Sequence, residues 1–559
     1  SGIWKKTGNL RKLFTTIIVL FALMFTYPII VQNKNVVCAQ DTQIPSGWLK
    51  FNPHSHGMFD VHDENDNVVG TIDESHIAGL GWSTGDTVEM IRDDFGAEGV
   101  MVHTPHAGHF EPYKEYWESE KRYENQHYST TTNVTMGEEY NHNGRHIGLA
   151  NITTFFSTND YQDFKDLRSN VTTQGGIMIV NHPSDGWIGN PPMFLQPGYE
   201  FDAMEVYNGR VELVDGPLAI PETDGRTHYR NAVTQGRLMA ACGGSDAHNT
   251  VGGWQVYTVV EDPQDLGNLD AAVDAIRQRR TYAAAYDMSV YDRSFFIECD
   301  LMGKITVERE IELNVTPPST DSYTVEIYKN NETDPAQTWS LTGESSVTYS
   351  IPNSDAQKKA AYSFEIFEGS SAETSDALVY TSAIWYQPVV SYNLSLNKGW
   401  NLVSIPVILE NPSIVEVLSS IEGDYNMVQW YDALCDSWLT YPGDSTDLSH
   451  HMAFWIHMKT DSVLEITGIS PFYTAIELLA SGRGWNLVGY PAMHNKTIQG
   501  ALSYIEDKYV AVQNFKSEDE GDPWKHYHID KPFNDLHHFN TGRGYWIKVN
   551  CDCEWVVFN

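Results

Sequence analysis

The sequence predicts an α/β region followed by mostly-β regions. Residues 45–297 contain apolar runs such as "EGVMVHT", "GGIMIVNH" and "GRLMAACGG", which alternate with helix-like segments. This alternation is typical of parallel strands in a barrel or an open sheet. Residues 298–388 instead alternate apolar and polar positions, and residues 392–559 contain an internal repeat. We therefore expect one α/β domain, one β-sandwich and two smaller β units.

The first 39 residues have the composition of a targeting segment. Four basic residues precede an uncharged run, Leu13–Val31, and a small-residue step ends at Ala39. This order is typical of a secretory signal cleaved after Ala39. The run is also long enough to serve as an uncleaved N-terminal anchor. Under both alternatives the rest of the chain is secreted or lies at the cell surface, and only this segment would contact a membrane.

The predicted β-sandwich, residues 298–388, is defined by its period-two pattern. The segments "KITVEREIELNVTP", "SYTVEIYKN" and "SVTYSIP" place apolar side chains at every second position, with turn-forming residues between them. Strands that bury one face show this pattern, and several short ones in succession favour two packed sheets.

The C-terminal region contains two copies of one unit, residues 392–470 and 476–559. "LNKGWNLVSIPV" and "SGRGWNLVGYPA" align Trp400 with Trp485, and each copy continues with a helix-like piece and an aromatic strand. Such self-similarity predicts two mostly-β repeats. Their aromatic residues either pack in cores or form a carbohydrate-binding face, which would attach the protein to a cell surface or a polysaccharide.

The charge balance limits the classes of partner. With 36 basic and 74 acidic residues the net charge is −38, which argues against nucleic-acid binding because that requires a basic surface. An acidic protein can still act on an anionic substrate if bound metal ions supply positive charge locally.

Histidine and acidic residues follow several apolar runs of the first region. They are His54, His56 and Asp60; His103, His106 and His109; Glu138, Glu139, His142 and His146; His182; and Asp246 and His248. One histidine at a strand end is weak evidence, but in β/α folds the strand ends converge on one face. Imidazole and carboxylate ligands suit zinc, manganese or iron rather than calcium.

The set of motifs resembles a known family. The order His-x-His, Thr-x-His, Gly-x-Glu, Asn-His-Pro and Gly-Ser-Asp-Ala-His resembles the PHP (polymerase and histidinol phosphatase) superfamily of metal-dependent hydrolases. "GEEYN", "NHPSDG" and "MEVYNG" are similar to its CehA/McbA-like branch, and the resemblance covers about residues 47–388. It implies a distorted seven-stranded β/α barrel with a centre of two or three divalent transition-metal ions.

The resemblance also implies which residues bind metal. It divides nine ligands among three ions: His54, His56, Glu139 and Asp246 for the first; Glu139, His146 and His182 for the second; and Asp60, His106 and His248 for the third. Pro105 stands where the family commonly has an acid. Asp60 lies closer to His56 than the family pattern expects, so His62 and Asp63 are local alternatives.

The implied activity is metal-assisted hydrolysis of a small phosphorylated or ester substrate, with a phosphoester favoured. His103 and His109 are the candidates to protonate the leaving oxygen. The alternatives are a carbamate or carboxyl-ester hydrolase using the same centre, and a non-catalytic cell-surface binding protein. A glycosidase pair is disfavoured because the adjacent Glu138 and Glu139 would point to opposite sides of a strand.

Overall fold

The computed structural model describes the chain from residue 46 to residue 558, with gaps. The described residues are 46–56, 58–73, 99–128, 132–157, 164–183, 192–196, 199–208, 225–244, 246, 254–287, 295–318, 321–369, 377–444, 446–481 and 483–558. All of them belong to the compact unit that spans residues 43–559. The predicted signal or anchor, residues 1–39, lies outside the described residues. Within the described residues, no helix combines the length and the apolarity needed to cross a membrane.

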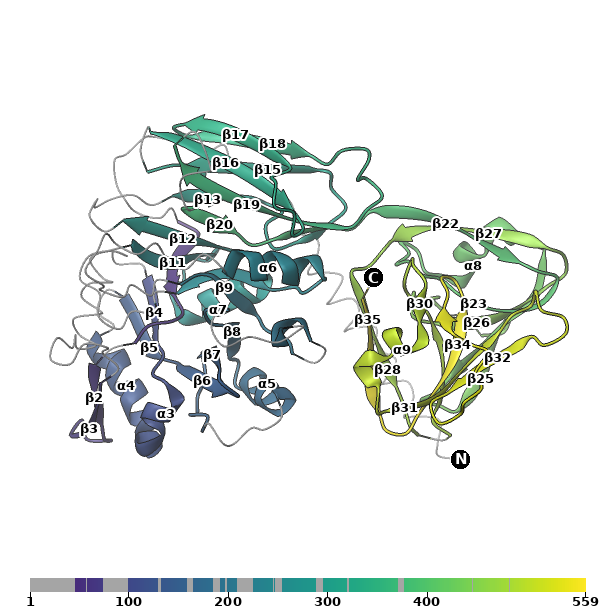
Figure 1. Cartoon of the computed structure of the whole chain (residues 1–559), viewed down its shortest axis with the longest axis horizontal. Coiled ribbons are helices and arrows are strands. Elements are labelled where there is room, and N and C mark those ends of the chain that lie inside the picture. Colours follow the sequence, from purple (N-terminus) through teal and green to yellow (C-terminus); the bar gives the residue numbers. More distant parts are fainter. Residues whose placement is uncertain are drawn as a thin grey trace, which may run out of the picture. The chain divides into compact units, whose positions relative to one another are not determined.

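Three parallel strands begin the first region (Figure 1). β1 (Trp48–Asn52) pairs with β4 (Gly99–His103), which pairs with β5 (Thr132–Met136). On its other side β1 pairs antiparallel with β11 (Trp254–Glu261), and β11 pairs antiparallel with β12 (Thr281–Asp287). β4 is buried at all five positions, which explains why it is a continuous apolar run.

A second sheet holds five strands in the order β10-β9-β8-β7-β6. β10 (Ala240–Gly244), β9 (Ala203–Asn208) and β8 (Ile177–Val180) are parallel. β7 (Arg145–Ala150) and β6 (Glu138–His142) continue the sheet antiparallel. An isolated parallel bridge joins His106, beyond the end of β4, to Glu139 in β6.

Short helices and one hairpin complete the first region. The elements are β2 (Met58–His62), β3 (Val68–Asp73), α3 (Ala107–Phe110), η1 (Glu111–Tyr116), α4 (Trp117–Tyr128), α5 (Phe164–Thr173), η2 (Met193–Leu195), α6 (Gly225–Thr234) and α7 (Leu269–Gln278). α7 shows why these residues form a helix. Asn268 accepts a hydrogen bond from the Ala271 amide at 3.0 Å, and Arg279 ends the helix with φ 60°.

The prediction of a seven-stranded β/α barrel is wrong. In the described residues strands dominate and are distributed over many small sheets, without a closed barrel surrounded by helices. Antiparallel strands continue both sheets beyond their parallel strands: β11 and β12 in one sheet, and β7 and β6 in the other. The apolar runs predicted buried strands, but they carried no information on which strands would be neighbours.

Residues 296–386 form two layers of strands around one core. One sheet contains β13 (Phe296–Glu298), β15 (Glu310–Thr316) and β18 (Ser345–Ser350). The other contains β14 (Ile305–Thr306), β16 (Ser322–Lys329), β17 (Gln337–Thr342), β19 (Ala360–Glu368), β20 (Val379–Thr381) and β21 (Ile384–Tyr386), and β20 joins it to β12. Leu313, Val325 and Ile366 meet in the shared core, and β15 alternates exposed and buried positions along its length.

The C-terminal region repeats one topology. The first copy comprises β22 (Val389–Leu396), β23 (Gly399–Ser404), α8 (Ile414–Val417), η3 (Ser419–Ile421), β24 (Tyr425–Asp432), β25 (Ser437–Tyr441), β26 (Ala453–Met458) and β27 (Ser462–Ile469). The second comprises β28 (Tyr473–Leu478), β29 (Trp485–Gly489), β30 (Lys496–Thr497), α9 (Ile498–Ala501), η4 (Ser503–Ile505), β31 (Tyr509–Phe515), β32 (Trp524–His528), β33 (His538–Phe539), β34 (Gly544–Val549) and β35 (Cys553–Phe558). The sheet orders β23-β26-β24-β25 and β29-β34-β31-β32 are equivalent. Each copy begins with a strand three residues before the boundary expected from the sequence.

Candidate metal centre

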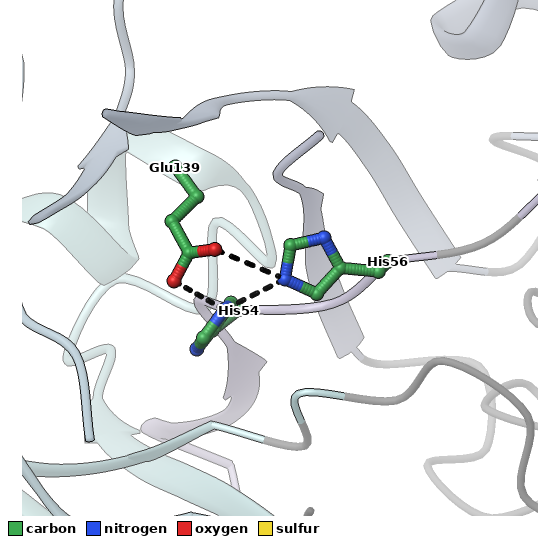
Figure 2. A group of neighbouring side chains, drawn as sticks. All are labelled: His54, His56 and Glu139. Atoms are coloured by element: carbon green, nitrogen blue, oxygen red, sulfur yellow. Dashed lines mark hydrogen bonds and ion pairs between the residues drawn. The ribbon is translucent and has the colours of Figure 1, made fainter. Parts of the chain in front are cut away.

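Two histidines follow the end of β1 and face each other. The His54 Nε2 and His56 Nε2 atoms are 3.0 Å apart, and both residues are buried. Figure 2 shows that both rings also turn toward the carboxylate of Glu139. Two imidazole nitrogens this close share either a proton or a positively charged ion.

Glu139 is the residue on which the histidines converge. Its carboxylate oxygens lie 3.0–3.5 Å from the ring nitrogens of five histidines: His54, His56, His106, His146 and His182. The Asn181 amide donates a further hydrogen bond to Oε1 at 3.1 Å. A carboxylate has about four lone-pair directions, so not all of these groups can be satisfied as hydrogen-bond donors. Imidazole nitrogens and a carboxylate gathered in this way fit the role of ligands to metal ions that they would share.

Asp246 brings a second carboxylate to the same place from beyond the end of β10. Its Oδ1 atom is 3.5 Å from His54 Nε2 and 3.3 Å from His56 Nε2, and its amide donates to the His54 carbonyl at 3.0 Å. The crowding requires a glycine at the end of β10. A Cβ at Gly244 would lie 2.2 Å from Glu205 Oε1 and 2.7 Å from His54 Cβ. Asp246 itself has φ 46°, a left-handed conformation that costs free energy for a non-glycine residue.

The geometry defines three sets of side chains able to hold a metal ion. They are His54, His56 and Glu139; His54, His182 and Asp246; and His106, Glu139 and His146. Within each set the ligand atoms all lie within 4.8 Å of one another. The first two sets are buried, whereas His106 and His146 of the third are partly exposed.

The charges of the centre are strongly coupled. Burial lowers the pKa of His54, but Glu205, Asp246 and Glu139 outweigh it and hold that pKa well above the ordinary value. Burial raises the pKa of Glu139, but His54 and the hydrogen-bonding histidines outweigh it and hold that pKa well below the ordinary value. The buried carboxylates therefore favour a positive charge beside His54, and a metal ion bound there would take the place of the proton on the imidazole.

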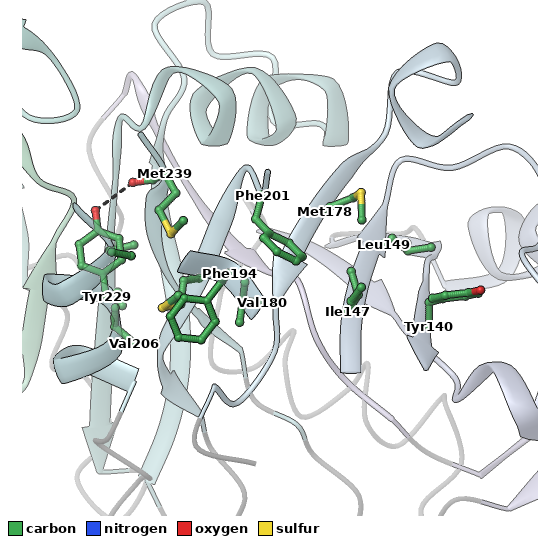
Figure 3. Packing of buried hydrophobic residues seen from close by; sticks show 14 of the residues in the cluster. Tyr140, Ile147, Leu149, Met178, Val180, Phe194, Phe201, Val206, Tyr229 and Met239 are labelled. Carbon is green, nitrogen blue, oxygen red and sulfur yellow. Dashed lines mark hydrogen bonds between the residues drawn. The ribbon is translucent and has the colours of Figure 1, made fainter. Parts of the chain in front are cut away.

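A hydrophobic cluster fixes the strands that carry the centre (Figure 3). Ile147, Val180 and Val206, from β7, β8 and β9, are fully buried in it. Tyr229 of α6 closes one side and donates a hydrogen bond to the Met239 carbonyl at 2.9 Å. Because side chains alternate along a strand, the other face of these strands buries Ile179 and Ala203 in a second cluster and also carries Glu205.

Glu205 is a component of the centre that the sequence analysis missed. It lies in β9 between Met204 and Val206, which both point into the hydrophobic cluster. Its carboxylate contacts His54 Nδ1 at 2.8 Å and accepts from the His182 amide at 2.7 Å. A carboxylate on Nδ1 fixes the ring orientation and leaves Nε2 directed at the centre. The signal was present as an acid between the apolar residues Met204 and Val206 in the segment "FDAMEVYNG".

Asp60 is not part of the centre, contrary to the prediction. Its side chain is exposed in β2 and accepts a hydrogen bond from Thr71 in β3 at 2.6 Å. The two local alternatives also have other roles. His62 pairs with Glu120 at 2.9 Å, and Asp63 accepts from the Asn65 and Asn67 amides in the hairpin turn. The position at which the motif departs from the family pattern therefore lies in β2, where the Asp60 side chain is exposed and bonded to β3 rather than to the centre. His248 lies outside the described residues.

The two proton-donor candidates occupy different environments. His103 is 1% exposed, and its Nδ1 contacts Glu124 of α4 at 2.6 Å. His109 is exposed in α3, with its ring centroid 5.1 Å from that of His106. His109 is accordingly the more accessible of the two.

α4 supplies a second pair of buried acids behind the histidines. Glu120 and Glu124 are 1% and 0% exposed and contact His62 and His103, respectively. Burial, followed by the repulsion from Glu124, raises the pKa of Glu120 to about 9. Sequence patterning gave no sign of this pair, because acids spaced four apart on a polar helix ordinarily face solvent.

No protein-family model and no curated protein matches the chain. Among solved structures, a Salmonella alpha-2-macroglobulin reacted with methylamine aligns at 9% identity over 56% of this chain and 23% of its own length, with a TM-score of 0.16. An Escherichia coli alpha-2-macroglobulin activated by porcine elastase aligns at 7% identity over 56% and 35%, also with a TM-score of 0.16. The chain spans well under two thirds of both structures, and similarity this low carries no argument about fold or function.

Proposed function

We propose that the protein is a metal-dependent hydrolase of small phosphate esters. The observation that carries the proposal is the convergence of five imidazoles on Glu139, with Asp246 beside them. The order of motifs that resembles metal-dependent hydrolases supports it independently of the fold, since it rests on the residues themselves.

The donor set favours two or three divalent transition-metal ions, namely zinc, manganese or iron. Mixed imidazole and carboxylate ligands suit these ions, and Glu139 has oxygen atoms in two of the three ligand sets. Ions held by these residues would lower the pKa of a bound water and neutralise phosphate oxygens. This contribution would offset the repulsion between an anionic substrate and a protein of net charge −38.

Side chains of the protein would orient the metal ligands and supply a proton to the leaving oxygen. Glu205 holds the His54 ring with Nε2 directed into the centre. Asn181 donates to Glu139 and orients its carboxylate. His109, exposed beside His106, would protonate the leaving oxygen of the substrate.

The test combines metal analysis with a substrate screen on the purified full chain. Metal content is measured by mass spectrometry, and hydrolysis of p-nitrophenyl phosphate, bis-p-nitrophenyl phosphate, p-nitrophenyl acetate and an aryl carbamate is measured with added manganese, iron or zinc. We expect bound transition metal and preferential turnover of a phosphate ester. Absence of both would overturn the proposal, and preferential turnover of the carboxyl ester or carbamate would reassign the bond.

A double substitution tests the position of the site. His182→Ala with Asp246→Ala removes two of the three side chains in one ligand set and leaves His54. We expect activity to be lost while the circular dichroism spectrum is retained. Undiminished hydrolysis in the doubly substituted protein would show that the reaction takes place elsewhere.

A further inference from the structure

The two C-terminal repeats form an aromatic groove between them. Its volume is about 440 Å³, and its walls include five tryptophans and a phenylalanine: Trp400, Trp438 and Trp455 from the first repeat, and Phe515, Trp524 and Trp546 from the second. We call these six residues the tryptophan groove. They lie on β23, β25, β26, β31, β32 and β34, so both four-stranded sheets contribute.

The aromatic contacts cross between the repeats in both directions. Trp455 of the first repeat lies 5.1 Å from Phe515 and 5.8 Å from Trp524 of the second, measured between ring centroids. Trp546, which aligns with Trp455 in the repeat, lies 5.8 Å from Trp438 of the first. Each repeat therefore places one tryptophan against the strand pair of the other, and neither repeat forms the groove alone.

Folding leaves these rings accessible. Trp400, Trp438 and Trp524 are 36%, 49% and 43% exposed, whereas Trp555, in the core of the second repeat, is 0% exposed. Leu402, Ala453 and Leu487 form the small core beneath the groove. Core packing therefore accounts for the rings only in part, and exposed aromatic clusters of this kind mark binding surfaces.

The chemistry of the walls identifies the ligand class. The lining residues, all within the described part of the chain, are aromatic except for Gln429, and none carries a charge. The negative faces of aromatic rings attract the weakly positive C–H groups that cover one face of a pyranose ring. The Gln429 amide can serve the hydroxyl groups at the rim of a sugar. A charged ligand would find no counter-charge among the lining residues.

The size of the groove separates a sugar from a protein partner. A cavity of about 440 Å³ lies in the range of small-ligand sites, about 300–1,000 Å³. A stable protein interface needs about 800 Å² on each partner. We propose that the tryptophan groove binds a neutral saccharide, as a segment of an uncharged polysaccharide.

The experiment is affinity electrophoresis of the purified full chain in native gels. The gels contain hydroxyethyl cellulose, xylan, galactomannan, dextran or amylopectin, with polygalacturonate as the anionic comparison. We expect at least one neutral polymer to retard the protein and polygalacturonate to leave its mobility unchanged. Trp438→Ala and Trp524→Ala change exposed rings, and each is expected to weaken retardation roughly 2- to 10-fold.

The repeat provides a matched control. Trp485 aligns with Trp400 in the sequence but does not line the groove, and it lies instead 6.0 Å from the Lys548 ammonium. Trp400→Ala should weaken retardation, and Trp485→Ala should not. The thermal unfolding midpoints of the two variants should differ by no more than the loss of one surface ring would cause.

Three results would overturn the proposal. The first is that none of the neutral polymers retards the protein. The second is an equal loss of retardation in Trp400→Ala and Trp485→Ala. The third is a change of molar mass by light scattering in Trp438→Ala or Trp524→Ala, because the groove would then be a contact between two copies of the chain. None of these results depends on the metal centre.

Discussion

The candidate metal centre and the tryptophan groove each gather one kind of side chain, but they are assembled in opposite ways. The centre collects polar residues from segments that do not resemble each other, from His54 to Asp246, and buries most of them. The groove collects aromatic residues from equivalent strands of two repeats and leaves several exposed. The first depends on unique positions, and the second on duplication.

This difference determines how each site responds to damage. In the centre three carboxylates, Glu139, Asp246 and Glu205, balance several imidazoles in a buried environment, so removing one charge disturbs its neighbours. In the groove each ring contributes separately, and losing one leaves the others in place. We expect large, cooperative losses in the first region and graded losses in the second.

Glu139→Gln is expected to have the largest effect. The substitution keeps the side-chain volume but removes the charge that the surrounding imidazoles share, so metal binding and hydrolysis should fall by more than about 100-fold. Metal content and hydrolysis rate of the purified protein provide the measurement. Asp60→Asn is the matched control, because Asp60 is exposed and bonded to Thr71. Equal losses in the two variants would contradict the assignment of the centre.

Glu205→Gln should have the next largest effect. An amide at this position still accepts from the His182 amide, but it no longer provides the negative charge beside His54 Nδ1. Loss of such a supporting carboxylate typically costs about 10- to 100-fold in metal affinity. Titration of the apoprotein with zinc measures it. An unchanged affinity would show that Glu205 serves packing alone.

Gly489→Ala tests the contact between the repeats. A Cβ at this position in β29 would lie 2.5 Å from the Met452 carbonyl oxygen and 2.6 Å from Ser404 Cβ, both in the first repeat. Such overpacking typically costs about 1–3 kcal/mol. Thermal unfolding of the full chain measures it against Gly521→Ala, whose Cβ would have no neighbour closer than 3.8 Å. Equal midpoints would refute the packing described for β29.

The smallest expected effect is a pH dependence in the repeats. Burial, followed by the nearby His451, lowers the pKa of His450 to about 4, and its Nε2 lies 3.0 Å from Thr474 Oγ1. Because the folded pKa is below that of the unfolded chain, the stabilisation is complete above about pH 6.5 and is lost as the pH falls toward 4.

His450→Gln should remove this contribution. Allowing for the partial exposure of the imidazole, we expect the unfolding free energy of the native protein to fall by about 1–2 kcal/mol more than that of the variant between pH 7 and pH 4.5. Parallel pH dependences of the unfolding midpoint in the two proteins would show that His450 does not titrate in this range.

The sequence predicted the members of the centre better than the fold that holds them. His54, His56, Glu139, His182 and Asp246 were found because polar residues that directly follow apolar runs meet at the ends of strands. The barrel was wrong because apolar runs do not specify strand neighbours or direction, and antiparallel strands entered both sheets.

The remaining errors have local causes. Asp60 was misplaced because spacing from a motif cannot reveal that β2 turns its side chain to solvent, toward Thr71. Glu205 was missed because one acid in an apolar strand has no spacing pattern, and its partner His54 lies 151 positions away. The repeat was visible from self-similarity, whereas the groove between its copies depends on how two sheets face each other.

The crossed tryptophan contacts determine how many copies of the repeat the groove needs. A gene encoding one repeat would specify a chain with Trp455 and its strand pair, but with no opposing rings for them to meet. Two copies in one chain supply both halves, because a surface that packs on its own copy is completed by that copy. Trp485, which aligns with Trp400, lies beside Lys548 instead. The groove is in this sense an internal dimer interface that has been left partly open.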